Sequence, residues 1–243
     1  MPLVPLRAVA YLVVCAVPAL AQPTLIRDEP PHLELSVGVA GMISPGPGTD
    51  IEREMRRLHL DFGDGQRAMP LTELPTLVPG GSVQAHIGVL RHVTIGGYLG
   101  IVANQTSGMT EQRGLVLAHS TITTGAFLVS FRPNPWLKIG AGPALHDRRF
   151  SFDDGRGKAL DGTEDARLGW IASGEAKFAR HAWTADHPPA FGYAQVQYRS
   201  IAPLRTQTAT VPVLPSRGAA IDWPSSLLHF SHWILGFGLG VEF

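Results

Sequence analysis

The sequence predicts an all-β protein whose antiparallel strands close into an up-and-down barrel, and three observations support this fold class. The chain has 243 residues, including 27 glycines and 20 prolines, and few long helical patterns. Segments in which apolar residues alternate with small or polar ones recur along it, as in strands with two different faces. After residue 22 no stretch approaches the roughly 18 consecutive apolar residues of a membrane-spanning helix.

The final segment, His229 to Phe243, shows the alternation most clearly. One face carries the bulky residues Trp233, Leu235, Phe237, Leu239, Val241 and Phe243. The other face carries Ile234, glycines and Glu242. Such a strand is expected where the bulky face meets lipid and the other face lines a narrow lumen. The segment resembles the closing strand of bacterial outer-membrane β-barrels, which implies that the six bulky residues are the signal read by the barrel assembly machinery.

Seven further segments alternate in the same way: 32–43, 81–90, 93–103, 115–132, 136–146, 167–179 and 191–201. In chain order their apolar faces include Leu33, Val83, Val93, Phe127, Leu137, Leu168 and Ala194. Each segment is long enough for a tilted strand to cross the hydrocarbon layer. Tight turns are expected at Arg91-His92 and at Pro133-Asn134-Pro135, because proline fixes φ and interrupts a strand ladder.

The connections between these segments alternate in length. They are long after the first, third, fifth and seventh segments and shorter after the others, as in barrels with long external loops and short periplasmic turns. An even number of strands leaves both termini in the periplasm. The sequence therefore predicts an eight-stranded antiparallel transmembrane β-barrel with long extracellular loops.

The N-terminal segment has the features of a signal peptide. Arg7 precedes an apolar run from Ala8 to Val17, and Ala19-Leu20-Ala21 matches a signal-peptidase site. We therefore expect a signal peptide at residues 1–21 and a barrel domain at residues 22–243. The single cysteine, Cys15, lies in the signal peptide, so no disulfide is expected in the mature chain. The formal net charge is zero, and this argues against a nucleic-acid partner, which would need a basic surface.

The whole mature chain resembles the small eight-stranded barrel families typified by the OmpA membrane domain, OmpX and OmpW. The most family-like stretch runs from Phe131 to Gly142 and shows a strand, a short turn and a strand. The resemblance implies a location in the bacterial cell outer membrane and contact with outer-membrane lipid and lipopolysaccharide. It also implies insertion by the barrel assembly machinery and a monomeric state.

If the apolar faces look outward, the opposite faces define a polar lumen. Its expected residues are Glu34, Gln84, His86, Lys138, Glu175, Lys177, Gln195, Gln197, Arg199 and Glu242. Enclosed charges must be paired, because an unpaired one costs several kcal/mol. We expect Glu34 or Glu242 to pair with Lys138 or Lys177. Glycines on the same faces are expected to relieve crowding in a lumen that side chains, or one small ligand, would fill.

The first long connection contains a predicted amphipathic helix. Thr49-Asp50-Ile51-Glu52 matches a capping box, and Ile51, Met55 and Leu58 follow at helical spacing. We expect this helix to cover the barrel mouth. The alternative is a surface on which the arginines at positions 53, 56 and 57 contact lipopolysaccharide phosphates or a partner protein.

Catalysis has one weak candidate. His229-Phe230-Ser231 resembles the short His-x-Ser pattern of lipid A deacylases, in which a histidine activates the serine. His232 stands where the family has an asparagine, and Glu242 lies at the far end of the strand. We therefore expect no enzyme activity and no cofactor. The ten histidines show no metal-ligand spacing, and His146 and His232 are expected at interfaces or in loops.

The sequence thus indicates an integral outer-membrane barrel with a structural or surface-interaction role and a filled lumen. A small-solute channel is the first alternative, and a lipid A-modifying hydrolase is the second. A secreted, lipocalin-like barrel would instead bury its apolar faces.

Overall fold

The structure is a computed structural model that describes residues 33–43, 47–58, 78–109, 115–153, 159–181, 190–214 and 220–243. The predicted signal peptide, residues 1–21, lies outside the described residues. Within the described ranges, no helix has both the length and the apolar character needed to cross a bilayer.

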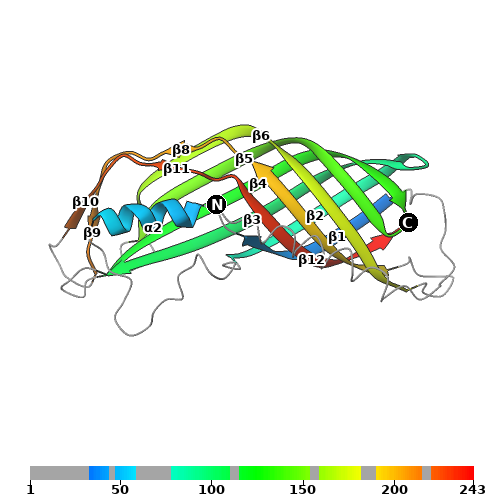
Figure 1. Cartoon of the computed structure of the whole chain (residues 1–243), viewed down its shortest axis with the longest axis horizontal. Helices are drawn as coiled ribbons and strands as arrows, with labels where there is room; N and C mark the ends of the chain where they lie inside the picture. The colour runs from blue at the N-terminus through cyan, green and yellow to red at the C-terminus, as the bar shows by residue number, and fades with distance from the viewer. Residues whose placement is uncertain are drawn as a thin grey trace, which may run out of the picture.

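Eight strands form one closed antiparallel barrel (Figure 1). They are β1 (Leu33–Ile43), β2 (Val78–Leu90), β3 (Val93–Met109), β4 (Leu115–Asn134), β5 (Leu137–Asp153), β6 (Ala159–His181), β7 (Ala190–Ser200) and β12 (His232–Glu242). Each strand pairs with its neighbours in the chain, and β1 pairs with β12 so that Glu34 lies opposite Glu242. The predicted fold class is confirmed, and closure gives every strand two partners, which a strand needs in lipid.

The middle strands are longer than the sequence analysis expected. β3, β4, β5 and β6 have 17, 20, 17 and 23 residues. Much of what was expected to be loop after the third and fifth strands is therefore paired strand, and only 110–114 and 154–158 separate these strands. These segments are strands because the backbone ladders between neighbouring strands continue through them. Gln105 lies opposite His119, and Arg149 lies opposite Glu164. The last strand is shorter than expected and begins at His232 rather than His229.

Smaller elements lie along the inner side of these extended strands (Figure 1). They are α2 (Pro47–Arg57), β8 (Leu204–Arg205), β9 (Ala209–Pro212), β10 (Ala220–Trp223) and β11 (Leu227–Leu228). β9 pairs with β10, and β8 pairs with β11. Because the start of β1 at Leu33, the C-terminal Phe243 and the short turns at 91–92 and 135–136 lie at the opposite end of the barrel, this end is the extracellular one. We refer to α2, β8–β11 and the extended ends of β4–β6 as the cap.

The outer surface of the barrel is apolar over most of its height. Large hydrophobic side chains from seven of the eight barrel strands, all but β7, are exposed, including Val37, Val83, Leu99, Phe127, Ile139, Leu168 and Leu239. Leu168 and Leu239 are 77% and 69% exposed, respectively. A continuous apolar band around a closed barrel is the surface that lipid hydrocarbon covers. The outward direction predicted for the apolar faces is therefore observed in this part of each strand.

Towards the extracellular end, the two faces exchange their character. In β4, Phe127 and Val129 point outward, whereas Ile122 and Ala118 are buried inside. The outward positions there are partly exposed threonines and, on the neighbouring strand, Asp147. This exchange marks the outer limit of the hydrocarbon layer, because above it water covers the outer face and apolar side chains pack inside. The alternation in the sequence does not reveal this exchange.

Candidate functional site

All ten residues expected in the lumen lie inside the barrel. Each is at most 6% exposed, although they come from β1, β2, β5, β6, β7 and β12. They do not form one group, however. The structure separates them into a charged network near the periplasmic end, a layer of amides and aromatic rings, and a middle region around Arg199.

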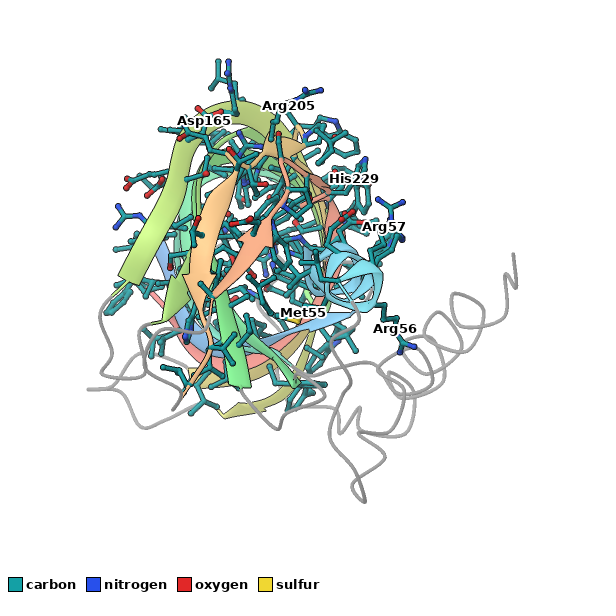
Figure 2. All side chains as sticks on the ribbon, turned by 90° about the vertical axis from the view of Figure 1, so that its left-hand side faces the viewer. Met55, Arg56, Arg57, Asp165, Arg205 and His229 are labelled. Carbon is teal, nitrogen blue, oxygen red and sulfur yellow. The ribbon has the colours of Figure 1, made fainter. Side chains whose placement is uncertain are left out.

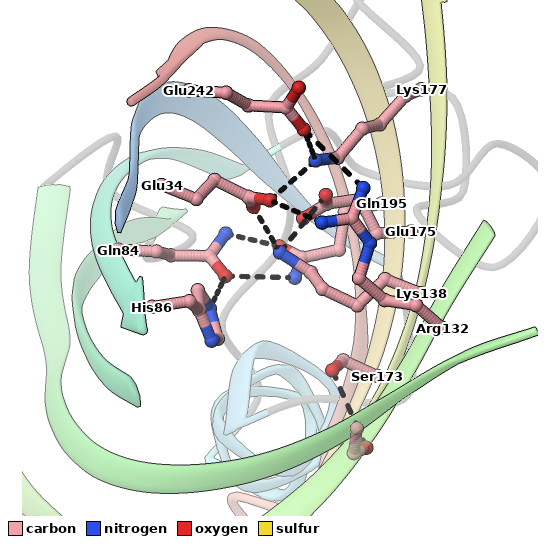
Figure 3. A network of polar contacts seen from close by, with 11 residues as sticks. Glu34, Gln84, His86, Arg132, Lys138, Ser173, Glu175, Lys177, Gln195 and Glu242 are labelled. Atoms are coloured by element: carbon pink, nitrogen blue, oxygen red, sulfur yellow. Dashed lines mark hydrogen bonds and ion pairs between the residues drawn. The ribbon is translucent and has the colours of Figure 1, made fainter. Parts of the chain in front are cut away.

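The charged network joins strands from opposite sides of the barrel (Figure 3). Lys138 Nζ donates to Glu34 at 2.6 Å and lies 3.1 Å from a Glu175 oxygen. Lys177 Nζ donates to Glu34 and, at 2.7 Å, to Glu242. Both lysines therefore contact the carboxylates with which pairing was expected. The network therefore spans the lumen from β1 and β12 to β5 and β6.

Arg132 completes this network, and the sequence analysis missed it. Its side chain comes from β4, is 5% exposed as a residue, and lies 3.4 Å from Glu242 and 3.9 Å from Glu34. Among the described residues, the network therefore contains three carboxylates (Glu34, Glu175, Glu242) and three cations (Arg132, Lys138, Lys177). The alternation of β4 carried the signal, because Arg132 follows buried Leu128 and Ser130 at every second position.

Aromatic rings fill the next layer because glycines make room for them. A Cβ atom at Gly38 or Gly238 would collide with the Tyr193 side chain, and one at Gly240 would collide with Phe191. The expectation that inward glycines relieve crowding is met at these positions. Beside the rings, the Gln84 and Gln195 amides bond each other at 3.3 Å, and His86 Nε2 lies 3.3 Å from Gln84 Oε1.

The middle of the lumen is organised by Arg199. Its Nε donates to Gln197 at 2.8 Å, one terminal nitrogen donates to Thr124 at 3.0 Å, and the other donates to the Tyr98 hydroxyl. Thr124 also contacts His146 Nδ1 at 3.0 Å.

His146 and His232 correct the sequence analysis, which placed them at interfaces or in loops. Both are buried in the lumen, at 0% and 1% exposed. His146 is in phase with Lys138 on β5, and His232 is in phase with Ile234 and Glu242 on β12. The alternation that places the other lumen residues on the inner faces therefore also indicates an inward position for His146 and His232.

An apolar core closes the extracellular end of the interior. It contains residues of α2, β4 and β5 and of the connection between β7 and β12: Ile51, Met55, Val116, Ala118, Ile122, Phe150, Phe152, Ile201, Leu204, Val211, Val213, Trp223, Leu228 and Phe230. The rings of Phe150, Phe152 and Trp223 pack with centroids 5.0–5.9 Å apart. The expected helix therefore covers the barrel mouth, and it does so by burying its apolar face.

The helix α2 is also held by a polar contact. Asp50, in its first turn, accepts the backbone N–H of His229 at 2.7 Å and lies 3.0 Å from His229 Nδ1. The helix begins at Pro47, two residues before the expected capping residue Thr49. Arg53 and Arg57 are exposed and bond Asp50 and Glu54 at 2.8 Å each. Figure 2, viewed onto this end, shows Arg56, Arg57 and His229 on the same side of the cap.

The two residues of the weak catalytic candidate are engaged elsewhere. His229 contacts Asp50, whereas the Ser231 hydroxyl donates to the Ile201 carbonyl and accepts the Ile201 N–H, both at 2.9 Å. Both residues precede β12, so they do not share a face of the last strand as expected. Glu242 lies in the charged network at the opposite end.

The residues of the predicted assembly signal lie on the outer face of β12. Phe237, Leu239 and Phe243 are 54%, 69% and 55% exposed, and Trp233, Leu235 and Val241 are partly exposed. Their recognition by the assembly machinery stays a prediction.

Comparison with known proteins gives resemblances in structure only. No family model matches the sequence, and no curated protein matches it. The attachment invasion locus protein Ail of Yersinia pestis, in complex with the heparin analogue sucrose octasulfate, is 12% identical with a TM-score of 0.48 over 88% of this chain and 99% of that chain. The outer membrane protein AlkL in DMPC bilayers is also 12% identical, with a TM-score of 0.34 over 92% of this chain and 95% of that chain.

These similarities are too distant to carry an argument about a ligand or a role. The assignment rests instead on the protein's own structure, which combines a closed sheet, an apolar outer band and buried polar side chains inside the barrel. A closed β-barrel with this surface is the architecture that spans the bacterial outer membrane. In architecture and location, the chain is a small eight-stranded integral outer-membrane β-barrel protein.

Proposed function

We propose that this protein is a closed, non-conducting barrel that acts through its extracellular cap, in a structural or surface-interaction role. The observation that supports this proposal is that the interior is occupied at two separate levels. The charged network fills the periplasmic end, and the apolar core fills the extracellular end.

A solute would have to break both closures. At the charged network it would have to separate pairs such as Lys138 and Glu34, and removing one partner of a buried pair costs about 3–5 kcal/mol. At the cap it would have to displace α2, whose residues Ile51 and Met55 are 0% exposed. The first barrier depends on ion pairs and the second on apolar packing, so no single change in salt concentration or pH removes both.

The outer surface of the cap offers a polar face to a partner. Arg149 pairs with Glu164 at 2.9 Å, Arg167 pairs with Asp165 at 2.9 Å, and Arg57 pairs with Glu54 on the helix. These pairs are partly or largely exposed, so each contributes little to stability and can rearrange at low cost. The mixed charge supports contact with a polar partner at the cell surface.

Conductance of the purified barrel in planar lipid bilayers tests this proposal. Four proteins form the experiment: the native chain, Lys177→Ala with Glu34→Ala, Ile51→Ala with Met55→Ala, and the quadruple variant. Heat-modifiable gel migration checks that each one is folded. We expect no stable openings from the native chain or from either double variant, because each keeps at least one closure and the layer of rings between the closures. Openings of the quadruple variant would show that the assay detects a lumen freed at both closures. Large, stable openings of the native chain would overturn the proposal and favour the small-solute channel.

We also propose that the protein does not hydrolyse lipid A. The separate hydrogen bonds of His229 and Ser231 support this, because a serine nucleophile needs an adjacent base. Mass spectrometry of lipid A from cells that produce the native protein or Ser231→Ala provides the test. Identical acylation is expected in both strains, and acyl loss that depends on Ser231 would refute the proposal.

A further inference from the structure

The middle of the lumen contains a buried cation without a counter-charge. Arg199 is 0% exposed, and its three hydrogen-bond partners, Gln197, Thr124 and Tyr98, are all neutral groups. Among the residues that the structure describes, none of the carboxylates forms an ion pair with it. The Tyr98 ring, 5.3 Å from the guanidinium, adds only a weak cation–π attraction.

The neighbouring levels do not supply the missing charge. Among the described residues, the three carboxylates of the charged network are already in contact with its three cations. Above Arg199, Arg148 already has Asp165 as its partner at 2.9 Å. An arginine keeps its proton in proteins, so one positive charge remains in the middle region. An uncompensated buried charge is costly, and proteins pair it or bind an ion.

Polar atoms without a partner surround this charge. Gln197 accepts from Arg199 through its oxygen, and its amide nitrogen, buried beside the guanidinium, has no hydrogen-bond partner within the described part of the chain. His232 lies directly opposite Arg199 in the ladder between β7 and β12. Its Nδ1 donates to the Phe230 carbonyl, so its buried Nε2, which has no partner among the described residues, is an acceptor that suits water and not an anion. Buried polar atoms of this kind are normally satisfied by water or by an ion.

We propose that the middle of the lumen binds one small monovalent inorganic anion, of the size of chloride, against Arg199 and the Gln197 amide. Water could bond the polar groups that lack a partner, but it could not neutralise the positive charge of Arg199. A larger or multivalent anion would not fit a lumen that side chains nearly fill, and it would exceed the single positive charge. This proposal does not rest on the proposed function, because it concerns binding at equilibrium and not passage.

The first test measures unfolding of the folded barrel in a neutral detergent at constant ionic strength, with chloride replaced stepwise by gluconate. If chloride binds only the folded state, the unfolding equilibrium constant falls by the factor 1 + [L]/Kd, about tenfold at ten times Kd. We expect a saturable chloride effect in the native chain and none in Arg199→Met. The exposed Arg149→Met variant is the matched control and should keep the full effect.

A second measurement needs no variant. Crystals of the native protein grown in bromide should show an anomalous peak next to the Arg199 guanidinium. Stability that does not respond to chloride, together with the absence of a bromide peak, would overturn the proposal. This holds even if Arg199→Met does not fold.

Discussion

The membrane-spanning and extracellular halves of β4 and β5 use the two faces of one strand in opposite ways. In the membrane half, Phe127 and Val129 face outward and Ser130 faces inward. In the extracellular half, Ile122 and Phe150 face inward, and Arg149 faces outward. The register between β4 and β5 is the same in both halves. The medium outside the sheet therefore decides which face carries the apolar residues.

The contents of the interior differ accordingly. In the membrane half, the interior holds charge pairs, rings packed against glycines, and only small apolar clusters such as that of Leu128, Ala144 and Ile171. The extracellular half is filled as a soluble protein is, by an apolar core. Four substitutions, ordered by expected effect, test this difference.

The largest effect is expected from Lys177→Met in the charged network. Lys177 contacts both Glu34 and Glu242, so its loss leaves a buried negative charge without compensation. The free energy of unfolding should fall by about 3–5 kcal/mol, measured by urea unfolding in detergent and read by gel migration. Adding Glu242→Gln restores neutrality and should recover a large part of this loss. A single variant as stable as the native chain would refute a structural role for the network.

In the cap, Met55→Ala should act locally. Met55 is 0% exposed, and its truncation leaves a cavity in the apolar core that costs about 2–5 kcal/mol. Because the membrane half does not depend on this core, we expect faster proteolysis of the cap while the barrel keeps its heat-modifiable migration. Arg57→Ala, on the exposed face of the same helix, is the control. Loss of the whole barrel on Met55→Ala would show that the two halves are not independent.

Ring packing in the membrane half is tested by Gly240→Ala. The added methyl group would collide with Phe191, and overpacking of this kind costs about 1–3 kcal/mol. Gly97→Ala is the matched control, because nothing lies within 4 Å of a Cβ there. Equal stability of the two variants in urea unfolding would contradict the packing described.

The smallest effect is expected from Arg149→Gln on the outside of the cap. Arg149 and Glu164 have side chains that are 60% and 59% exposed, and such a pair contributes about 0–1 kcal/mol. Urea unfolding should be almost unchanged, and the small difference should vanish at high salt. A large loss would indicate that these side chains are not in water.

Much of the barrel could be predicted from the sequence because alternation is a strict property of a two-faced strand. The terminal strand from Trp233 to Phe243 and the inward positions of Glu34 and Lys177 follow from that period alone. Two features did not follow. Alternation at every second residue does not show whether a strand face meets lipid, water or the interior. The change near Thr123 and Asp147, where the apolar residues move from the outer to the inner face, was therefore missed.

Depth along the barrel was the other missing quantity. Strand tilt and register determine which inward-facing residues contact one another. Neither can be deduced from the sequence of one strand. Arg199 was therefore expected together with the other charged residues of the lumen. In the structure, Arg132 is the arginine that contacts Glu34 and Glu242, and Arg199 lies in the middle of the lumen beside Gln197.

The exchange of faces along β4 is the central claim, and spin labels in lipid nanodiscs test it most directly. Cys15 is the only cysteine of the sequence and lies in the expected signal peptide, so single cysteines can be placed at Val129, Thr121 and Ile122. The label at 129 should collide preferentially with oxygen dissolved in lipid, the label at 121 with a water-soluble nickel complex, and the label at 122 with neither. Preferential collision of the labels at both 121 and 129 with oxygen would contradict the account.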